Sequence, residues 1–184
     1  QLASARDLKA LGVPAAELSA RLTAVQLGTS KMSRTQPIAA ADAIRTAVPV
    51  GASPSRGPRS AAVTVIGFGS FDDFGWRRQW EQLEQLRKDR GDRVRLVWKH
   101  LAPETALTAE PAAQLLLEAR AQKGDDAFWK AFDLLVAGAG RGPSDLDLIA
   151  TRAGLSAKTT QAAIASHKHR ALVDADMDLG DAFN

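Results

Sequence analysis

The chemistry open to this chain is limited first by a residue type that it lacks. Among its 184 residues there is no cysteine, and sulfur occurs only in two methionines. Thiol exchange, disulfide formation and thiolate metal binding all need cysteine, so the chain itself cannot perform them. The remaining candidates for chemistry are three histidines, a short aspartate run and one glycine-rich loop.

The histidines do not have the spacing of a metal site. His167 and His169 are two positions apart, and such residues point in different directions on a helix. Neither a cysteine nor a third neighbouring histidine completes a ligand set. We therefore predict that His167 and His169 are exposed helix histidines, that His100 is structural, and that no metal is bound.

The aspartate run and the glycine-rich loop also have structural explanations. Asp174, Asp176 and Asp178 imitate the start of a calcium loop, but the sixth position is Leu179, where that loop requires glycine. We interpret the run as the acidic face of a helix. The segment Gly138–Pro143 follows a predicted helix and lacks the Gly-Lys-Ser/Thr of a phosphate-binding loop. A flexible connection is predicted there, and no cofactor is expected.

The charge pattern argues against two classes of partner. The formal net charge is +3 and the charged fraction is 24%, with Lys and Arg spread among Asp and Glu. This mixture is typical of solvated helix faces and lacks the basic stripe of a nucleic-acid-binding protein. Because no run of about 18 apolar residues occurs, no membrane span is predicted.

Two strand patterns flank one helix pattern in the middle of the chain. Ala62–Phe68 is a nearly continuous apolar, β-branched run, as in a strand buried on both faces. Phe71–Arg90 leads into a helix pattern with Trp76 and Trp80 at helical spacing, and Val94–His100 is a second strand pattern. This order predicts a βαβ unit with parallel pairing.

Only helices are predicted after this unit. One begins at Glu110-Pro111 and runs to about Gln122, and a second begins at Asp125-Asp126. Ser144-Asp145 caps a third, and Ser156 caps the last, with a kink near His169. The pattern predicts an α/β fold with an inserted helical subdomain.

The N-terminal third has a different composition. Residues 1–27 have the spacing of two short helices, and residues 28–60 are rich in Gly, Pro and Ser, as in a linker, with a short helix around residues 39–47. Residues 61–184 then form the predicted folded domain.

A set of local sequences between Val48 and Asn184 occurs, in this order, in one known family. They are Arg56-Gly57-Pro58, Phe68, Phe71, Arg77-Arg78, Gly91–His100, Glu110–Ala113, Phe128-Trp129 and Ser166–Arg170. On these residues the chain resembles the DsbA-like family of the thioredoxin superfamily. The resemblance implies a thioredoxin-like fold.

In that family a Cys-x-x-Cys motif lies where this chain has Asp73, Phe74, Gly75 and Trp76. The two cysteine positions correspond to Asp73 and Trp76. In active relatives the helix N-terminus stabilises the thiolate of the first cysteine. Asp73 keeps a negative charge there, but a carboxylate takes no part in sulfur exchange. The resemblance therefore implies a degenerate, redox-inactive site.

Three interpretations of this site remain open. In the first, Asp73 caps the helix and Trp76 is a packing residue. In the second, Phe71, Asp73, Phe74, Trp76 and Arg77 form a surface for an extended polypeptide, with Phe74 and Trp76 exposed as a binding hot spot. In the third, Asp73 performs a new catalytic reaction, although no partner acid, base or metal cluster accompanies it.

The resemblance also predicts that part of the fold is supplied from elsewhere. Relatives continue past the last helix into a cis-proline loop, an antiparallel strand pair and a final helix, whereas this sequence ends at Asn184. We expect the C-terminal strands, missing here, to come from a longer protein of which the chain is a fragment or processed piece, or from a second chain. Residues 1–27 resemble the helical tail of a preceding domain in a tandem protein.

The expected function follows from a DsbA-like fold without cysteine. We predict a redox-inactive module that binds, holds or assembles proteins or unfolded polypeptides, located in the periplasm or otherwise outside the cytoplasm, as the family's usual location implies. The alternative is a non-catalytic copy within a larger thiol–disulfide oxidoreductase whose active Cys-x-x-Cys lies in another domain. In neither case is this chain itself expected to be an enzyme.

Overall fold

A computed structural model describes four stretches of the chain, namely residues 47–71, 74–103, 107–138 and 143–182. The helices predicted within residues 1–27 and around residues 39–47 lie outside these stretches. By their contacts, the described residues form two compact units. The strand unit contains residues 47–67 and Gln79–Val97, and the helical unit contains Phe68–Arg78 and the residues from Trp98 onward.

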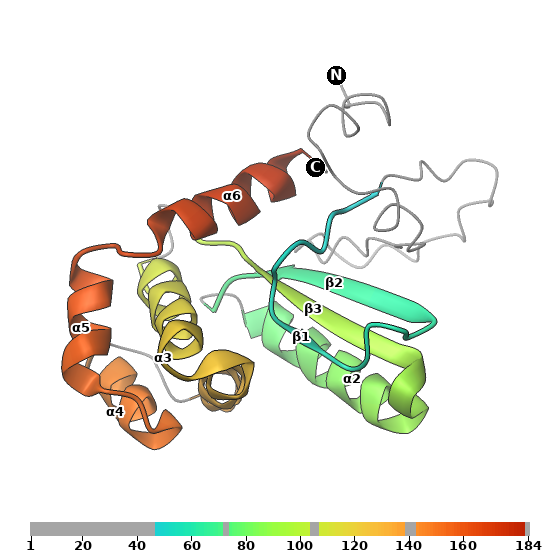
Figure 1. Cartoon of the computed structure of the whole chain (residues 1–184), viewed down its shortest axis with the longest axis horizontal. Coiled ribbons are helices and arrows are strands. Elements are labelled where there is room, and N and C mark those ends of the chain that lie inside the picture. Colours follow the sequence, from blue (N-terminus) through green and yellow to red (C-terminus); the bar gives the residue numbers. More distant parts are fainter. Residues whose placement is uncertain (1–46, 72–73, 104–106, 139–142, 183–184) are drawn as a thin grey trace. The chain divides into compact units, whose positions relative to one another are not determined.

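From β2 onward, the elements along the chain follow the predicted order (Figure 1). They are β1 (Ser55–Arg56), β2 (Val63–Gly69), α2 (Phe74–Arg90), the 3₁₀ turn η1 (Gly91–Arg93), β3 (Val94–His100), α3 (Ala109–Val136), α4 (Pro143–Ala153), α5 (Ala157–Ala165) and α6 (Arg170–Asp181). The succession of β2, α2 and β3 confirms the predicted strand, helix and strand.

The described sheet has three strands in the order β1-β3-β2. Strand β1 pairs antiparallel with β3, with Ser55 opposite Val97 and Arg56 opposite Leu96. The prediction that residues 28–60 are only a linker is wrong at β1. A two-residue strand has too little pattern to be read from sequence, and its pairing depends on a partner about 40 residues away.

The strand unit has a small apolar core beneath β3. Leu96 and Val97 are fully buried, and the indole of Trp80 on α2 is 2% exposed. At Gly67 on β2, a Cβ atom would lie 3.0 Å from the Trp80 ring, so the missing side chain permits this close approach. Arg56 on β1 donates to Glu84 on α2 at 2.8 Å, which ties the edge strand to the helix.

Helix α3 is the centre of the helical unit. Helices α4, α5 and α6 all pack against it, and α4 packs against α5. Residues 112–119 of α3 are all buried, so here the helix is enclosed on every side. Gly124 has φ 78° and ψ −170°, a conformation open only to glycine, and it interrupts the helix. This break confirms that two predicted helices meet near residues 122–125.

The last predicted helix is also interrupted. Ser156 caps α5 as expected, since its hydroxyl accepts a hydrogen bond from the Thr159 backbone N–H at 3.3 Å. Helix α5 ends at Ala165, and α6 begins at Arg170. Between them His167 has φ 50°, which turns the chain sharply. The predicted kink near His169 is therefore a complete break between two helices.

Among the described residues, no helix combines the length and the apolar character needed to cross a bilayer.

Candidate functional site

Trp76, at the second degenerate cysteine position, lies in the interior of the helical unit. Its indole is 3% exposed, and Phe71, three residues beyond the end of the predicted strand, is 6% exposed. The Trp76 ring meets Trp98 edge to face, with centroids 4.4 Å apart, and Phe132 at 5.7 Å. Phe71 contacts Trp76 at 5.3 Å. Aromatic pairs at such distances stabilise by about 0.5–1.5 kcal/mol each beyond area burial.

These rings belong to a larger group, here called the aromatic cluster. Its members are Phe71, Trp76, Trp98, Phe128, Trp129 and Phe132. They come from the loop after β2, from α2, from β3 and from α3. The cluster therefore joins a loop, a strand and two helices of the helical unit.

Gly69 makes room for the cluster. A Cβ atom there would lie 2.4 Å from the Trp98 ring and would overlap the Trp76 indole as well. Neither ring can withdraw easily, since both are buried and packed against other rings. The glycine at this position is therefore a steric requirement of the two tryptophans.

The structure decides part of the prediction for this site. Of the open interpretations, the one in which Trp76 is a packing residue is confirmed and the one in which its indole is exposed is wrong, because the indole contacts Phe71, Trp98 and Phe132. Phe71 is also interior. Gly75 is exposed, and Arg77 is half-buried and donates from Nη2 to the Phe71 carbonyl at 3.3 Å. Asp73 lies outside the described residues, and Phe74 begins α2.

His100 lies at the edge of the aromatic cluster and is 2% exposed. Its Nδ1 accepts a hydrogen bond from Trp98 Nε1 at 3.1 Å, so the neutral ring carries its proton on Nε2. Burial lowers the pKa of His100 to about 4, a shift that nearby Lys99 reinforces and Asp176 opposes. The ring is therefore neutral near pH 7 and acts as part of the core, as predicted for a structural histidine.

A buried ion pair joins β3 to α6. Lys99 is 5% exposed and donates from Nζ to Asp176 Oδ1 at 3.0 Å, while the His100 backbone N–H donates to Oδ2 at 2.9 Å. Asp176 lies on a helix, as predicted for the aspartate run, and it also supplies the counter-charge that the buried Lys99 requires. Asp174 pairs with Arg170 at 2.7 Å.

Four polar residues on α3 form a second feature of the helical unit, here called the polar stripe. Glu110, Gln114, Glu118 and Gln122 are spaced four apart, so they lie along one face of the helix. Gln114 is fully buried and Glu118 is 1% exposed. Buried polar groups need partners, and the stripe finds them on α5, on α6 and in the turn between these helices.

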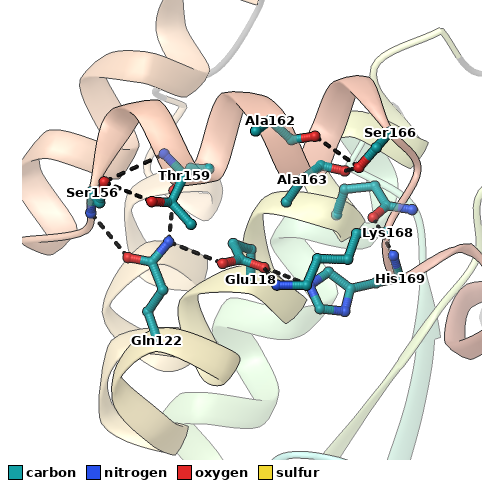
Figure 2. Close-up of polar contacts among 11 residues, drawn as sticks. Glu118, Gln122, Ser156, Thr159, Ala162, Ala163, Ser166, Lys168 and His169 are labelled. Atoms are coloured by element: carbon teal, nitrogen blue, oxygen red, sulfur yellow. Dashed lines mark hydrogen bonds and ion pairs between the residues drawn. The ribbon is translucent and has the colours of Figure 1, made fainter.

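Glu118 is the centre of the polar stripe (Figure 2). Its Oε2 accepts from Lys168 Nζ and from His169 Nε2, both at 2.8 Å, and its Oε1 accepts from Gln122 Nε2 at 3.1 Å. Burial by itself would raise the pKa of Glu118, but these hydrogen bonds outweigh it and hold the pKa below its ordinary 4.5. The carboxylate is thus ionised and connects α3 to the α5–α6 turn.

The remaining members extend the same contact. Gln122 Oε1 accepts from the Ser156 backbone N–H at 2.9 Å (Figure 2). Its Nε2 donates to Thr160 at 3.3 Å. Gln114 accepts from the His169 backbone N–H at 2.8 Å. Through Ser156 and Thr160, α3 therefore holds the start of α5 in place. Through Gln114 and Glu118 it also holds the turn that follows α5.

Both histidines of the turn between α5 and α6 contact carboxylates of α3. His167 Nδ1 lies 2.6 Å from Glu110 Oε1, and His169 Nε2 bonds to Glu118. His167 is exposed as predicted, but the prediction is wrong for His169, whose side chain is 11% exposed because it covers the buried Glu118. Among the described residues, no three acidic or histidine side chains group as metal ligands would. Of the glycine-rich loop, residues 139–142 lie outside the described chain.

No family model matches the chain. It is 34% identical over 128 residues to the Na⁺/H⁺ antiporter NhaA 1 of Salinispora arenicola. That similarity covers 68% of this chain but 19% of the antiporter, so the chain spans less than a fifth of that protein.

Three solved structures have a similar fold. BdbD from Bacillus subtilis matches with a TM-score of 0.61 and 20% identity, over 70% of this chain and 74% of BdbD. The thiol–disulfide exchange protein α-DsbA2 from Wolbachia pipientis matches with 0.60 and 14%, over 71% and 69%. A thioredoxin-like oxidoreductase from Silicibacter pomeroyi matches with 0.60 and 24%, over 70% and 72%. At these identities the likeness establishes the fold.

Replacing Trp76 by alanine tests the aromatic cluster. Because the indole is enclosed by three other rings, Trp76→Ala should lower the free energy of unfolding by about 3–5 kcal/mol. The matched control is Arg78→Ala, an exposed position two residues along α2, with an expected change within about 0.5 kcal/mol. Urea unfolding followed by far-UV circular dichroism measures both. Equal, small losses in the two variants would contradict the packing role of Trp76.

Replacing Glu118 by glutamine tests the polar stripe. The amide keeps the side-chain volume but loses the charge that Lys168 and His169 contact, so unfolding should become easier by about 2 kcal/mol at pH 7. The control Asp125→Asn removes an exposed carboxylate paired with Arg120 at 2.6 Å and should cost less than about 1 kcal/mol.

The Glu118→Gln variant should also differ from the parent chain in how its free energy of unfolding depends on pH. Since the folded-state pKa of Glu118 is below its unfolded value, its contribution is complete above pH 4.5 and is lost as the pH falls through the folded-state pKa. Urea titrations from pH 7 to pH 3 should therefore show a smaller acid loss in Glu118→Gln than in the parent chain. Parallel curves would rule out the charged contact as a source of stability.

Proposed function

Because the chain has the thioredoxin-like fold of DsbA-type thiol–disulfide oxidoreductases and contains no cysteine, we propose that it is a redox-inactive module that binds polypeptides. The observation that carries the proposal is the absence of cysteine from a chain with this fold. We propose that the buried Trp76, which the resemblance assigns to the second cysteine position, anchors the first turn of α2 for the surface around it.

The chemistry supports the redox-inactive half of the proposal. Disulfide exchange requires a thiolate that attacks one sulfur of the substrate while the other sulfur leaves with the electron pair. With two methionine thioethers as its sulfur atoms, the chain supplies neither that nucleophile nor a second thiol to release a mixed disulfide. Reaction at Asp73 is not proposed, because among the described residues no three acidic or histidine side chains group as metal ligands would.

The proposed binding surface is the outer side of the first turn of α2. Of the residues predicted from sequence, Phe71 and Trp76 support this turn from within. Gly75 on this turn is exposed. The residues proposed to contact an extended polypeptide are those predicted from sequence, namely Asp73, Phe74 and Arg77. Aromatic residues and arginine are the residue types enriched in binding hot spots.

A capture experiment tests this proposal. Phe74→Ala should weaken binding of a permanently unfolded, S-carboxymethylated protein by about 2 kcal/mol, and thermal unfolding of the variant checks that its fold is kept. Leu172→Ala is the matched control, since Leu172 is 57% exposed on α6 and should not affect capture. Binding is measured by fluorescence anisotropy of the labelled unfolded protein. In parallel, the chain should fail to reduce insulin. Unchanged capture in Phe74→Ala, or insulin reduction by the pure chain, would refute the respective half of the proposal.

We further propose that the module functions within a longer membrane transporter. The support is the likeness to a stretch amounting to 19% of a Na⁺/H⁺ antiporter.

Strand β2 lies at one edge of the described three-stranded sheet, and Val63 on it is 49% exposed. An edge strand offers unpaired N–H and C=O groups. We propose that a segment beyond the described residues, in the same protein or in a second chain, pairs with β2. Attachment to a transporter would agree with a location outside the cytoplasm.

Hydrogen exchange tests this arrangement. The full-length product of the gene, purified from membranes in detergent, should show slower amide exchange over Val63–Gly69 than the 184-residue chain, because the outward amides gain partners. The internal control is Leu115–Leu117 on α3, which is buried in the chain and should exchange equally in both. Equal β2 exchange in both proteins would contradict pairing within the longer protein, and a full-length product absent from membranes would contradict the transporter.

A further inference from the structure

Two arginines of the strand unit, Arg59 and Arg95, belong to backbone segments that pack against each other, and neither is paired with a carboxylate of the described residues. Gly57 is pressed against β3, since a Cβ atom there would lie 2.4 Å from the Val94 carbonyl oxygen and 3.0 Å from the Arg95 Cα. The backbone therefore crosses β3 at Arg95, and Arg59 follows two residues later. Burial lowers the pKa of Arg95, and the positive charge of Arg59 lowers it further, which agrees with this proximity.

The surroundings of Arg95 leave its charge unbalanced. Its side chain is half-buried and donates from Nη2 to the Ser55 hydroxyl at 3.0 Å. Its Nε is enclosed without a hydrogen-bond acceptor. In the part of the chain that the structure describes, no carboxylate pairs with Arg95 or with the exposed Arg59. A guanidinium in this position is usually paired.

A neighbouring arginine shows the contrast. Arg56, one residue after Ser55 on β1, forms an ion pair with Glu84 at 2.8 Å. Glu84 forms a second ion pair with Arg87 at 3.0 Å. The described part of the strand unit has seven Lys and Arg residues but four Asp and Glu residues. Its acidic groups are thus too few for its arginines, and the excess positive charge is at its least balanced around Arg59 and Arg95.

We propose that Arg59 and Arg95 bind a phosphate group, either free or on a phospholipid headgroup. Planar guanidinium groups donate two parallel hydrogen bonds to phosphate oxygens, and two of them match an anion with up to two negative charges. A carboxylate, with one charge, would leave one arginine unbalanced. This site shares no residue with the proposed polypeptide surface, so each stands or fails separately.

Titration with inorganic phosphate and sedimentation with vesicles test the proposal. The first arm follows the Nε–H signals of the arginine side chains by NMR at constant ionic strength. The second compares vesicles of phosphatidylglycerol with vesicles of phosphatidylcholine. Arg59→Gln should weaken binding roughly tenfold, the loss expected for one charge-assisted contact. Because Arg59 is exposed, this variant should keep the fold, which circular dichroism checks.

Arg152→Gln is the matched control, since it removes the same charge from an exposed position on α4. A saturable phosphate shift that weakens in Arg59→Gln but not in Arg152→Gln assigns the site to free phosphate. Sedimentation with phosphatidylglycerol alone, with the same dependence on the variants, assigns it to a lipid headgroup. Absence of both, or equal loss in the two variants, overturns the proposal.

Discussion

Trp76 packs edge to face against Trp98 with ring centroids 4.4 Å apart, and Gly69 leaves the space that both indoles occupy. This contact fixes the first turn of α2 against β3 and, through Phe132, against α3. The first turn of α2 is therefore anchored by a buried indole that contacts side chains of β3 and α3.

The helical unit is held together in a different way at its far end. Few large apolar residues of α5 and α6 are buried, and Val173 packs on Ala113 and Leu117 as a small group. The polar stripe supplies what this packing lacks, because an ionised Glu118 in the interior must be satisfied by donors with fixed positions. The turn between α5 and α6 is therefore specified by hydrogen-bond geometry, with His167 held in an uncommon backbone conformation to reach it.

The two proposed sites differ in how the fold treats charge. Glu118, Lys99 and Arg56 each contact an opposite charge within 3.0 Å. Among the described residues the half-buried Arg95 has no such contact, although the segment after β1 packs against it at Gly57, two residues before Arg59. The positive charge that is left unpaired at the proposed Arg59–Arg95 site would attract an anion. The proposed polypeptide surface depends instead on packing, because the aromatic cluster lies beneath it.

The amino-acid sequence by itself determined the order of strands and helices, the Ser156 cap and the break at Gly124, because periodicity, capping and glycine conformations are properties of short segments. It also excluded sulfur chemistry, since composition needs no coordinates. Only the tertiary structure decided that Trp76 is interior, that His169 and Asp176 face buried charges, and that Ser55–Arg56 is a strand. Those outcomes depend on partners 50 and 77 residues away, as in Lys168 with Glu118 and Lys99 with Asp176. A short stretch of sequence does not specify which distant side chains will pack against it, and these tertiary contacts determine whether a residue is buried.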